Sequence, residues 1–177
     1  MSQFWHIFFA YVHVLGIVLF VGPQFFLGLA WVPASRQITD QHSRARAMRT
    51  VTRRFLYIGG AGLLLAIVAG SYLIATWRSY YGVPEGVSFT SLRFGVVFII
   101  KMALLLVMLV AVAAHTFWLG PRLLAATEEA AQGSSGAEAK LRDLRLRSML
   151  LSLVGLGLAL AMMVMGVLMR TTQWSLR

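Results

Sequence analysis

Residues 93–119 read RFGVVFIIKMALLLVMLVAVAAHTFWL, and this stretch decides the fold. It holds no acidic residue, and its basic residues are Arg93, Lys101 and His115. A helix that crosses the hydrocarbon core of a bilayer needs about 20 mainly apolar residues. Strands of a membrane barrel would alternate apolar and polar residues, and no such alternation occurs. The stretch therefore predicts a transmembrane α-helix over about residues 91–119.

Three more long apolar stretches lie before and after residues 93–119. They cover about residues 4–32, 55–76 and 149–169. Pro23 lies inside the earliest stretch and is expected to kink it, and Pro33 fits its end. The sequence predicts an all-α fold, an integral membrane four-helix bundle formed by a single transmembrane domain over residues 1–177.

The composition of the whole chain agrees with a membrane protein. Of its 177 residues, 59% are hydrophobic and 12% are charged, whereas soluble domains carry about 45–50% apolar and about 25% charged residues. There is no cysteine, which excludes disulfides, thiolate metal sites and cysteine nucleophiles. The first residues lack a basic segment, and the apolar run after them is longer than that of a secretion signal, so the first span is expected to remain in the mature protein.

Basic residues gather in two of the three loops. The loop after the first span holds six arginines, the loop after the third holds five basic residues, and the second loop and the tail together hold four. Cytoplasmic loops carry an excess of Lys and Arg. The two basic loops are therefore predicted to be cytoplasmic and both termini to lie outside the cytoplasm, in a cell inner (plasma) membrane. The net charge of +10 is assigned to orientation and to lipid headgroups, not to nucleic acid.

The basic loops also contain helical patterns. Asp40 is expected to cap a helix that runs directly into the second span. Residues 121–132 are expected to extend the third span, 133–136 (GSSG) to break it, and 137–147 to lead into the fourth. Small residues four apart in the second span, namely Gly62, Ala66 and Gly70, allow membrane helices to approach closely.

Three ionisable side chains lie well inside the spans: His13, Lys101 and His115. Such residues are costly in a bilayer and are functional candidates by default. No Asp or Glu lies in any span, so a charged Lys101 lacks an acidic partner there. His6 lies near the outer end of the first span, and His42 lies in a cytoplasmic loop and is expected to be solvated.

Helical geometry places these side chains on two stripes. At about 100° per residue, one face of the first span carries His6, His13 and Gln24. One face of the third span carries Phe94, Lys101, Met108 and His115.

Depth adds a second constraint. His13 and Lys101 each lie about 14 Å below the outer boundary, so they are expected to meet inside the bundle. His115 lies about 21 Å farther along the axis, so it should not share a metal with Lys101.

The chemistry of these residues suits a bound metal cofactor. The fourth span is expected to bring Met162, Met163 and Met165 to the level of His13, and Met149 to the level of His115. Haem iron is commonly held by His or Met, and imidazole and thioether ligands also suit copper. The predicted cofactor-binding residues are His13, Lys101 and His115, and the predicted metal ligands are His13 and His115. The alternative is a polar cluster that only orders helix packing, with the methionines as flexible apolar filling.

Three segments carry a resemblance to known families. Residues 11–36 (YVHVLGIVLFVGPQFFLGLAWVPASR) resemble the first span of the HemJ-type protoporphyrinogen oxidases and of the copper-resistance CopD-like proteins. Residues 46–73 are similar to their second span, and residues 93–117, with an intramembrane lysine, to their third. The HemJ-type resemblance implies haem b held near His13 and Lys101, and the CopD-like resemblance implies copper handling.

Three functions follow as hypotheses. The first is a membrane redox protein that binds b-type haem, for electron transfer or porphyrin oxidation, by itself or with other membrane subunits. The second is a copper transport or resistance protein, and the third is a non-catalytic scaffold subunit of a membrane complex. A Soret band separates haem from copper, and the scaffold predicts neither metal. Whether the protein is an enzyme is left open, and no hydrolase or NTPase motif is present.

Overall fold

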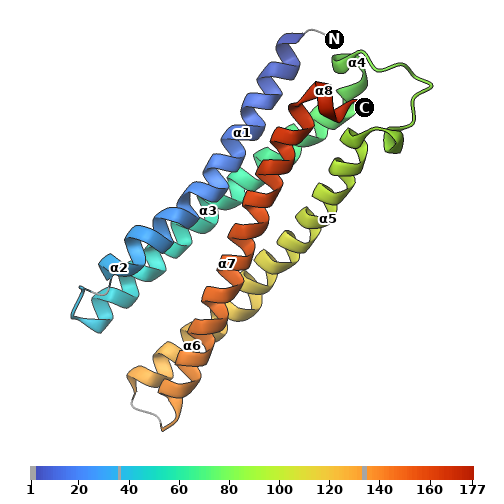
Figure 1. Cartoon of the computed structure of the whole chain (residues 1–177). Helices are drawn as coiled ribbons and strands as arrows, with labels where there is room; N and C mark the ends of the chain where they lie inside the picture. Colours follow the sequence, from blue (N-terminus) through green and yellow to red (C-terminus); the bar gives the residue numbers. More distant parts are fainter. Residues whose placement is uncertain (1–2, 36, 133–134) are drawn as a thin grey trace. The chain divides into compact units, whose positions relative to one another are not determined.

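The computed structural model describes residues 3–35, 37–132 and 135–177, and these contain helices and no strand (Figure 1). Four of the described helical stretches are long and apolar enough to cross a membrane: Gln3–Ser35, Arg46–Ala75, Arg93–Ala130 and Ala137–Arg170. The predicted all-α fold with four membrane-length helices is confirmed.

The chain divides into two compact units, Met1–Val87 and Ser88–Arg177. Each unit is a helical hairpin, in which one membrane-length helix is followed by a second that returns beside it (Figure 1). The single domain over residues 1–177 stays a prediction.

The first hairpin begins with α1 (Gln3–Phe25), which continues through the π-helical turn η1 (Phe26–Trp31) into α2 (Val32–Ser35). Its returning helix is α3 (Gln41–Ala75), which packs along α1 and is followed by the short α4 (Trp77–Tyr81).

The second hairpin has the same order of elements. After the turn η2 (Phe89–Ser91), its first helix comprises α5 (Arg93–Ala113), the π-helical turn η3 (Ala114–Leu119) and α6 (Gly120–Ala131). Its returning helix is α7 (Ala137–Arg170), which packs against α5 and α6 and is followed by the short α8 (Thr172–Ser175).

The helical patterns in the basic loops are confirmed. The backbone N–H of Ser43 donates to Asp40 Oδ2 at 2.9 Å, so Asp40 caps the start of α3. Across the turn of the second hairpin, Lys140 Nζ of α7 lies 2.8 Å from Glu129 Oε2 of α6. The membrane-length helices are longer than the predicted spans because these polar segments continue them without a break. The GSSG turn includes Gly133 and Ser134, which lie outside the described residues.

A π-helical turn interrupts the first long helix of each hairpin. The N–H of Val32 donates to the Leu27 carbonyl, and the N–H of Gly120 donates to the His115 carbonyl, each five residues back. Each turn is followed two residues later by a proline, Pro33 or Pro121. A proline ring clashes with the carbonyl four residues before it in an α-helix, and the wider π-helical turn relieves that crowding. The α geometry continues past Pro23 as far as Phe25.

Glycines bring α1 and α3 into backbone contact. A Cβ added to Gly16 would lie 2.6 Å from both the Ala66 nitrogen and the Gly62 oxygen. A Cβ added to Gly62 would lie 2.7 Å from the Gly16 oxygen. No side chain fits at either position, which confirms the predicted close approach at the small residues of the second span.

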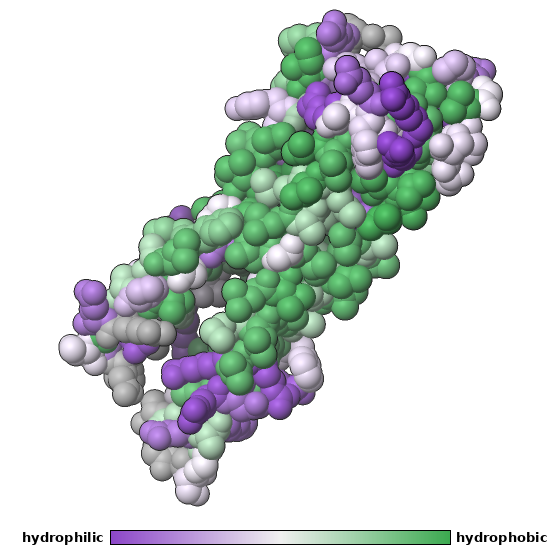
Figure 2. Space-filling model, viewed as in Figure 1, coloured by the Kyte–Doolittle hydropathy of each residue, from purple (hydrophilic) through white to green (hydrophobic). Residues whose placement is uncertain are grey.

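Apolar side chains along the helices face outward. Leu29, Phe117 and Val167 are 77%, 80% and 68% exposed within the described structure. Figure 2 shows hydrophobic residues over the middle of the helices and hydrophilic residues toward their ends. Such surfaces are costly in water and suit contact with the hydrocarbon of a bilayer.

Candidate functional site

His13 lies in α1, half-buried against α3. Its Nδ1 lies 2.6 Å from the carbonyl oxygen of Ala66. A carbonyl oxygen only accepts hydrogen bonds, so Nδ1 must be the protonated nitrogen that donates. In the neutral imidazole the lone pair is then on Nε2, and this is the tautomer in which Nε2 ligates a metal.

Two glycines make this hydrogen bond possible. Gly16, three residues after His13 and on the same side of α1, lets the α1 backbone touch α3. A Cβ added to Gly70 of α3 would lie 3.0 Å from Cε1 and 3.1 Å from Nδ1 of His13. The imidazole therefore occupies the space that a side chain at residue 70 would need.

Lys101 lies in α5, half-buried over a glycine of α7. Its Nζ lies 3.6 Å from the position of a Cβ added to Gly166. Lys101 forms no ion pair or hydrogen bond with any residue that the structure describes.

His115 lies in the π-helical turn η3, and its carbonyl accepts the i+5 bond from Gly120. Its Nδ1 is buried and has no hydrogen-bond partner among the described residues. π-Helical turns are rare and are frequent at functional sites. The sequence had marked His115 as a candidate but gave no sign of the π-helical turn.

His6 belongs to a packed cluster at the start of the first hairpin. It is only 7% exposed, its ring stacks on Tyr80 at 3.5 Å, and its Nδ1 lies 3.3 Å from Thr76 Oγ1. Gln24, the other polar residue on this stripe, donates to the Phe20 carbonyl of its own helix. Both polar groups therefore have structural roles.

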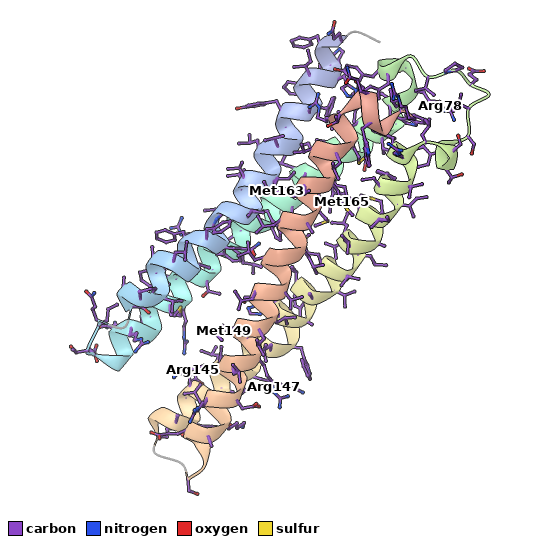
Figure 3. The ribbon with its side chains drawn as sticks, in the orientation of Figure 1. Arg78, Arg145, Arg147, Met149, Met163 and Met165 are labelled. Atoms are coloured by element: carbon purple, nitrogen blue, oxygen red, sulfur yellow. The ribbon has the colours of Figure 1, made fainter. Side chains whose placement is uncertain are left out.

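The loop after α4 is held by one arginine. Arg78 donates to the carbonyl oxygens of Pro84 and Val87, both at 2.8 Å, and its guanidinium lies over the Trp77 ring (Figure 3). The sequence had counted Arg78 only as an outer-side charge. The hydrogen bonds of Arg78 to the loop could not be predicted from the sequence, because their acceptors are backbone carbonyls, which every residue has.

The methionines of α7 lie at two levels. Figure 3 shows Met163 and Met165 in the half of α7 nearer α8, which is also the half of Gly166, and Met149 nearer α6. The predicted level of Met162, Met163 and Met165 with His13 stays a prediction. The meeting of His13 with Lys101 stays a prediction, as does the role of Met149 beside His115.

Within the described parts of the chain, no group of three or more His, Cys, Asp or Glu side chains gathers into a site for a metal ion. The predicted metal ligands His13 and His115 therefore act, if they bind metal, without a cluster of such side chains around them.

No protein-family model, curated protein or solved structure matches this chain. The resemblance to HemJ-type and CopD-like proteins stays an expectation.

Proposed function

We propose that the protein is a membrane redox protein that binds b-type haem, with His13 as an iron ligand. The observation that carries the proposal is the 2.6 Å contact between His13 Nδ1 and the Ala66 carbonyl. A metal-ligating histidine almost always donates its other ring N–H to a carboxylate, a backbone carbonyl or water, which fixes the tautomer and the ring orientation. His13 meets that condition inside an apolar helix pair.

The side chains available as metal ligands favour haem over a metal ion that is held by the protein alone. An ion bound by protein alone takes three or four side-chain ligands, and the described residues gather no group of three His, Cys, Asp or Glu. The iron of haem needs only one or two protein ligands, because the porphyrin supplies the rest. Histidines without such a group around them therefore fit haem better than an ion held by His, Cys, Asp or Glu alone. A copper site completed by methionine thioethers is the alternative.

Lys101 is assigned to the same haem, either as a neutral amine ligand or as the partner of a propionate. A lysine charge at the centre of a span costs about 2.5–3.5 kcal/mol on insertion scales, and no described residue offsets it. A propionate or ligation removes that cost, whereas a role in packing alone does not. The bound haem would supply one-electron chemistry, for electron transfer or for porphyrin oxidation of the HemJ type.

The proposal also states how the protein is oriented in the membrane and what it contacts there. Both termini lie outside the cytoplasm in an inner (plasma) membrane, because the arginine-rich turns of both hairpins favour the cytoplasmic side. The bilayer is the immediate partner, and other membrane subunits would receive or deliver the electrons.

The test is the absorption spectrum of the detergent-purified protein, oxidised and reduced, together with metal analysis. We expect a Soret band that His13→Ala abolishes and that Lys101→Met shifts. The matched control is His6→Phe, which keeps an aromatic ring against Tyr80 and should leave the spectrum unchanged. His115→Ala should leave the haem of His13 bound. Copper without haem would instead support the CopD-like alternative, and neither metal would support the scaffold alternative.

A further inference from the structure

The two π-helical turns lie at matching places, 88 residues apart. The carbonyls that accept the i+5 bonds belong to Leu27 and His115, and the donors are Val32 and Gly120. The prolines that follow, Pro33 and Pro121, have the same separation. Six-residue π-helical turns are rare, and each hairpin has one that ends two residues before a proline, so turn and proline together form one shared feature of the two hairpins.

The same separation relates the stripes that face the returning helices. The first hairpin carries His6, His13, Phe20 and Leu27 at intervals of seven. The second carries Phe94, Lys101, Met108 and His115, each 88 residues later. Burial follows the pairing: His6 and Phe94 are 7% and 4% exposed, and Phe20 and Met108 are 8% and 2% exposed.

The returning helices also correspond. α3 has 35 residues and α7 has 34, and each is followed after one residue by a short helix. The glycine that faces His13 is Gly70 and the glycine that faces Lys101 is Gly166, which are 96 residues apart. Thr76, which precedes α4, and Thr172, the first residue of α8, share that separation. The eight extra residues belong to α6, which has 12 residues where α2 has 4.

We infer that the chain is a tandem repeat of one helical hairpin, and that His13 and Lys101 occupy one ligand position in its two copies. This inference rests on the proposed function only in calling the two side chains ligands. Independently of haem, it states that His13 and Lys101 are each the second residue of the stripe in their hairpin, and that each faces a glycine of the returning helix. The position is then defined by the hairpin, and either side chain should serve in either copy.

A ligand exchange tests the equivalence in the full chain. His13→Lys alone leaves two amines and no imidazole for the iron, so haem occupancy should fall at least tenfold. The exchange His13→Lys/Lys101→His returns one imidazole to the two positions and should restore it. Lys101→His alone should keep the haem and give a spectrum of two imidazole ligands. The matched control is His13→Lys/Met102→His, which places the histidine one residue away and should not rescue. An exchange that fails to rescue, or a control that rescues equally, overturns the equivalence.

A second measurement is independent of haem. Because the chain has no cysteine, pairs can be introduced without background and bridged with a short bifunctional thiol reagent. His13→Cys/Gly70→Cys and Lys101→Cys/Gly166→Cys should both be bridged, and Lys101→Cys/Gly157→Cys should not, since a Cβ at Gly157 has no neighbour within 4 Å. Bridging of the first pair without the second overturns the repeat. Bridging of both pairs, when the purified unsubstituted protein holds no haem, upholds the repeat and overturns only the proposed function.

Discussion

The bond between His13 and the Ala66 carbonyl depends on residues that have almost no side chain. Gly16 lets the two backbones touch, and Gly70 leaves room for the imidazole. The sequence identified His13, Lys101 and His115 because ionisable residues stand out in apolar runs. It could not identify their partners, because a carbonyl is the same at every residue and Ala66 is 53 residues away from His13.

Replacing Gly70 by alanine should disturb the imidazole directly. The new Cβ would lie 3.0–3.1 Å from two ring atoms of His13, and overpacking of this kind costs about 1–3 kcal/mol. We expect a lower thermal midpoint in detergent and a shifted or weakened Soret band. Gly60→Ala is the matched control in the same helix, because its Cβ would meet nothing within 4 Å. Equal effects from the two substitutions would contradict the assigned role of Gly70.

His6 should contribute to stability and not to the cofactor. His6→Ala removes the ring stacked at 3.5 Å on Tyr80, which should cost about 0.5–1.5 kcal/mol beyond the lost apolar area. His6→Phe keeps an aromatic ring against Tyr80 and should lose less. Thermal unfolding measures both variants. Loss of haem in His6→Phe with unchanged stability would show instead that His6 is a ligand.

At the scale of elements, the apolar runs predicted the four long helices and the loop patterns predicted their extensions. Asp40 was recognised as a cap because capping depends on nearby residues. The π-helical turns were missed. Proline was expected to kink or end a helix, and nothing in a single sequence distinguishes those outcomes from a wider turn just before it. That choice is made by the packing of the whole hairpin.

Deletions can test the π-helical turn. Its i+5 bond accommodates one residue more than an α turn, so removal of Thr116 should convert η3 to α-helix and leave the flanking helices in register. Removal of Leu106 from α5 should rotate the following residues by about 100° and move Met108, which is 2% exposed, out of its contacts. The variant without Thr116 should therefore be expressed in the membrane at a higher level, and unfold at a higher temperature, than the variant without Leu106. Equal damage from both deletions would show that η3 is needed in its present form.

At the scale of the molecule, the charge of the loops predicts orientation. Six arginines in one turn and five basic residues in the other should hold both turns in the cytoplasm. Reporter fusions after Gln37 and Gly133 should be cytoplasmic, and a fusion after Gly82 should be exterior. The reverse pattern would invert the depths assigned to His13, Lys101 and His115.

The similarity of the first helices could not be predicted from residue identity, because at the separation of 88 residues they share only Pro33 and Pro121. The returning helices share several residues at the separation of 96, among them Gly70 with Gly166. The similarity of the hairpins becomes visible only when the π-helical turns and the two glycines supply the register. Sequence patterns therefore predicted the helices and the candidate ligands, while the relation between the ligands required the backbone.

The arginine-rich turn inside each hairpin has a consequence for biosynthesis. As the chain leaves the ribosome, each pair of helices emerges together with its own topogenic signal. The orientation of the second pair of helices does not depend on that of the first pair. The translocon can therefore release the chain two helices at a time. Charge reversal in one turn should then misorient that pair alone, whereas a chain oriented only by its first helix would invert throughout.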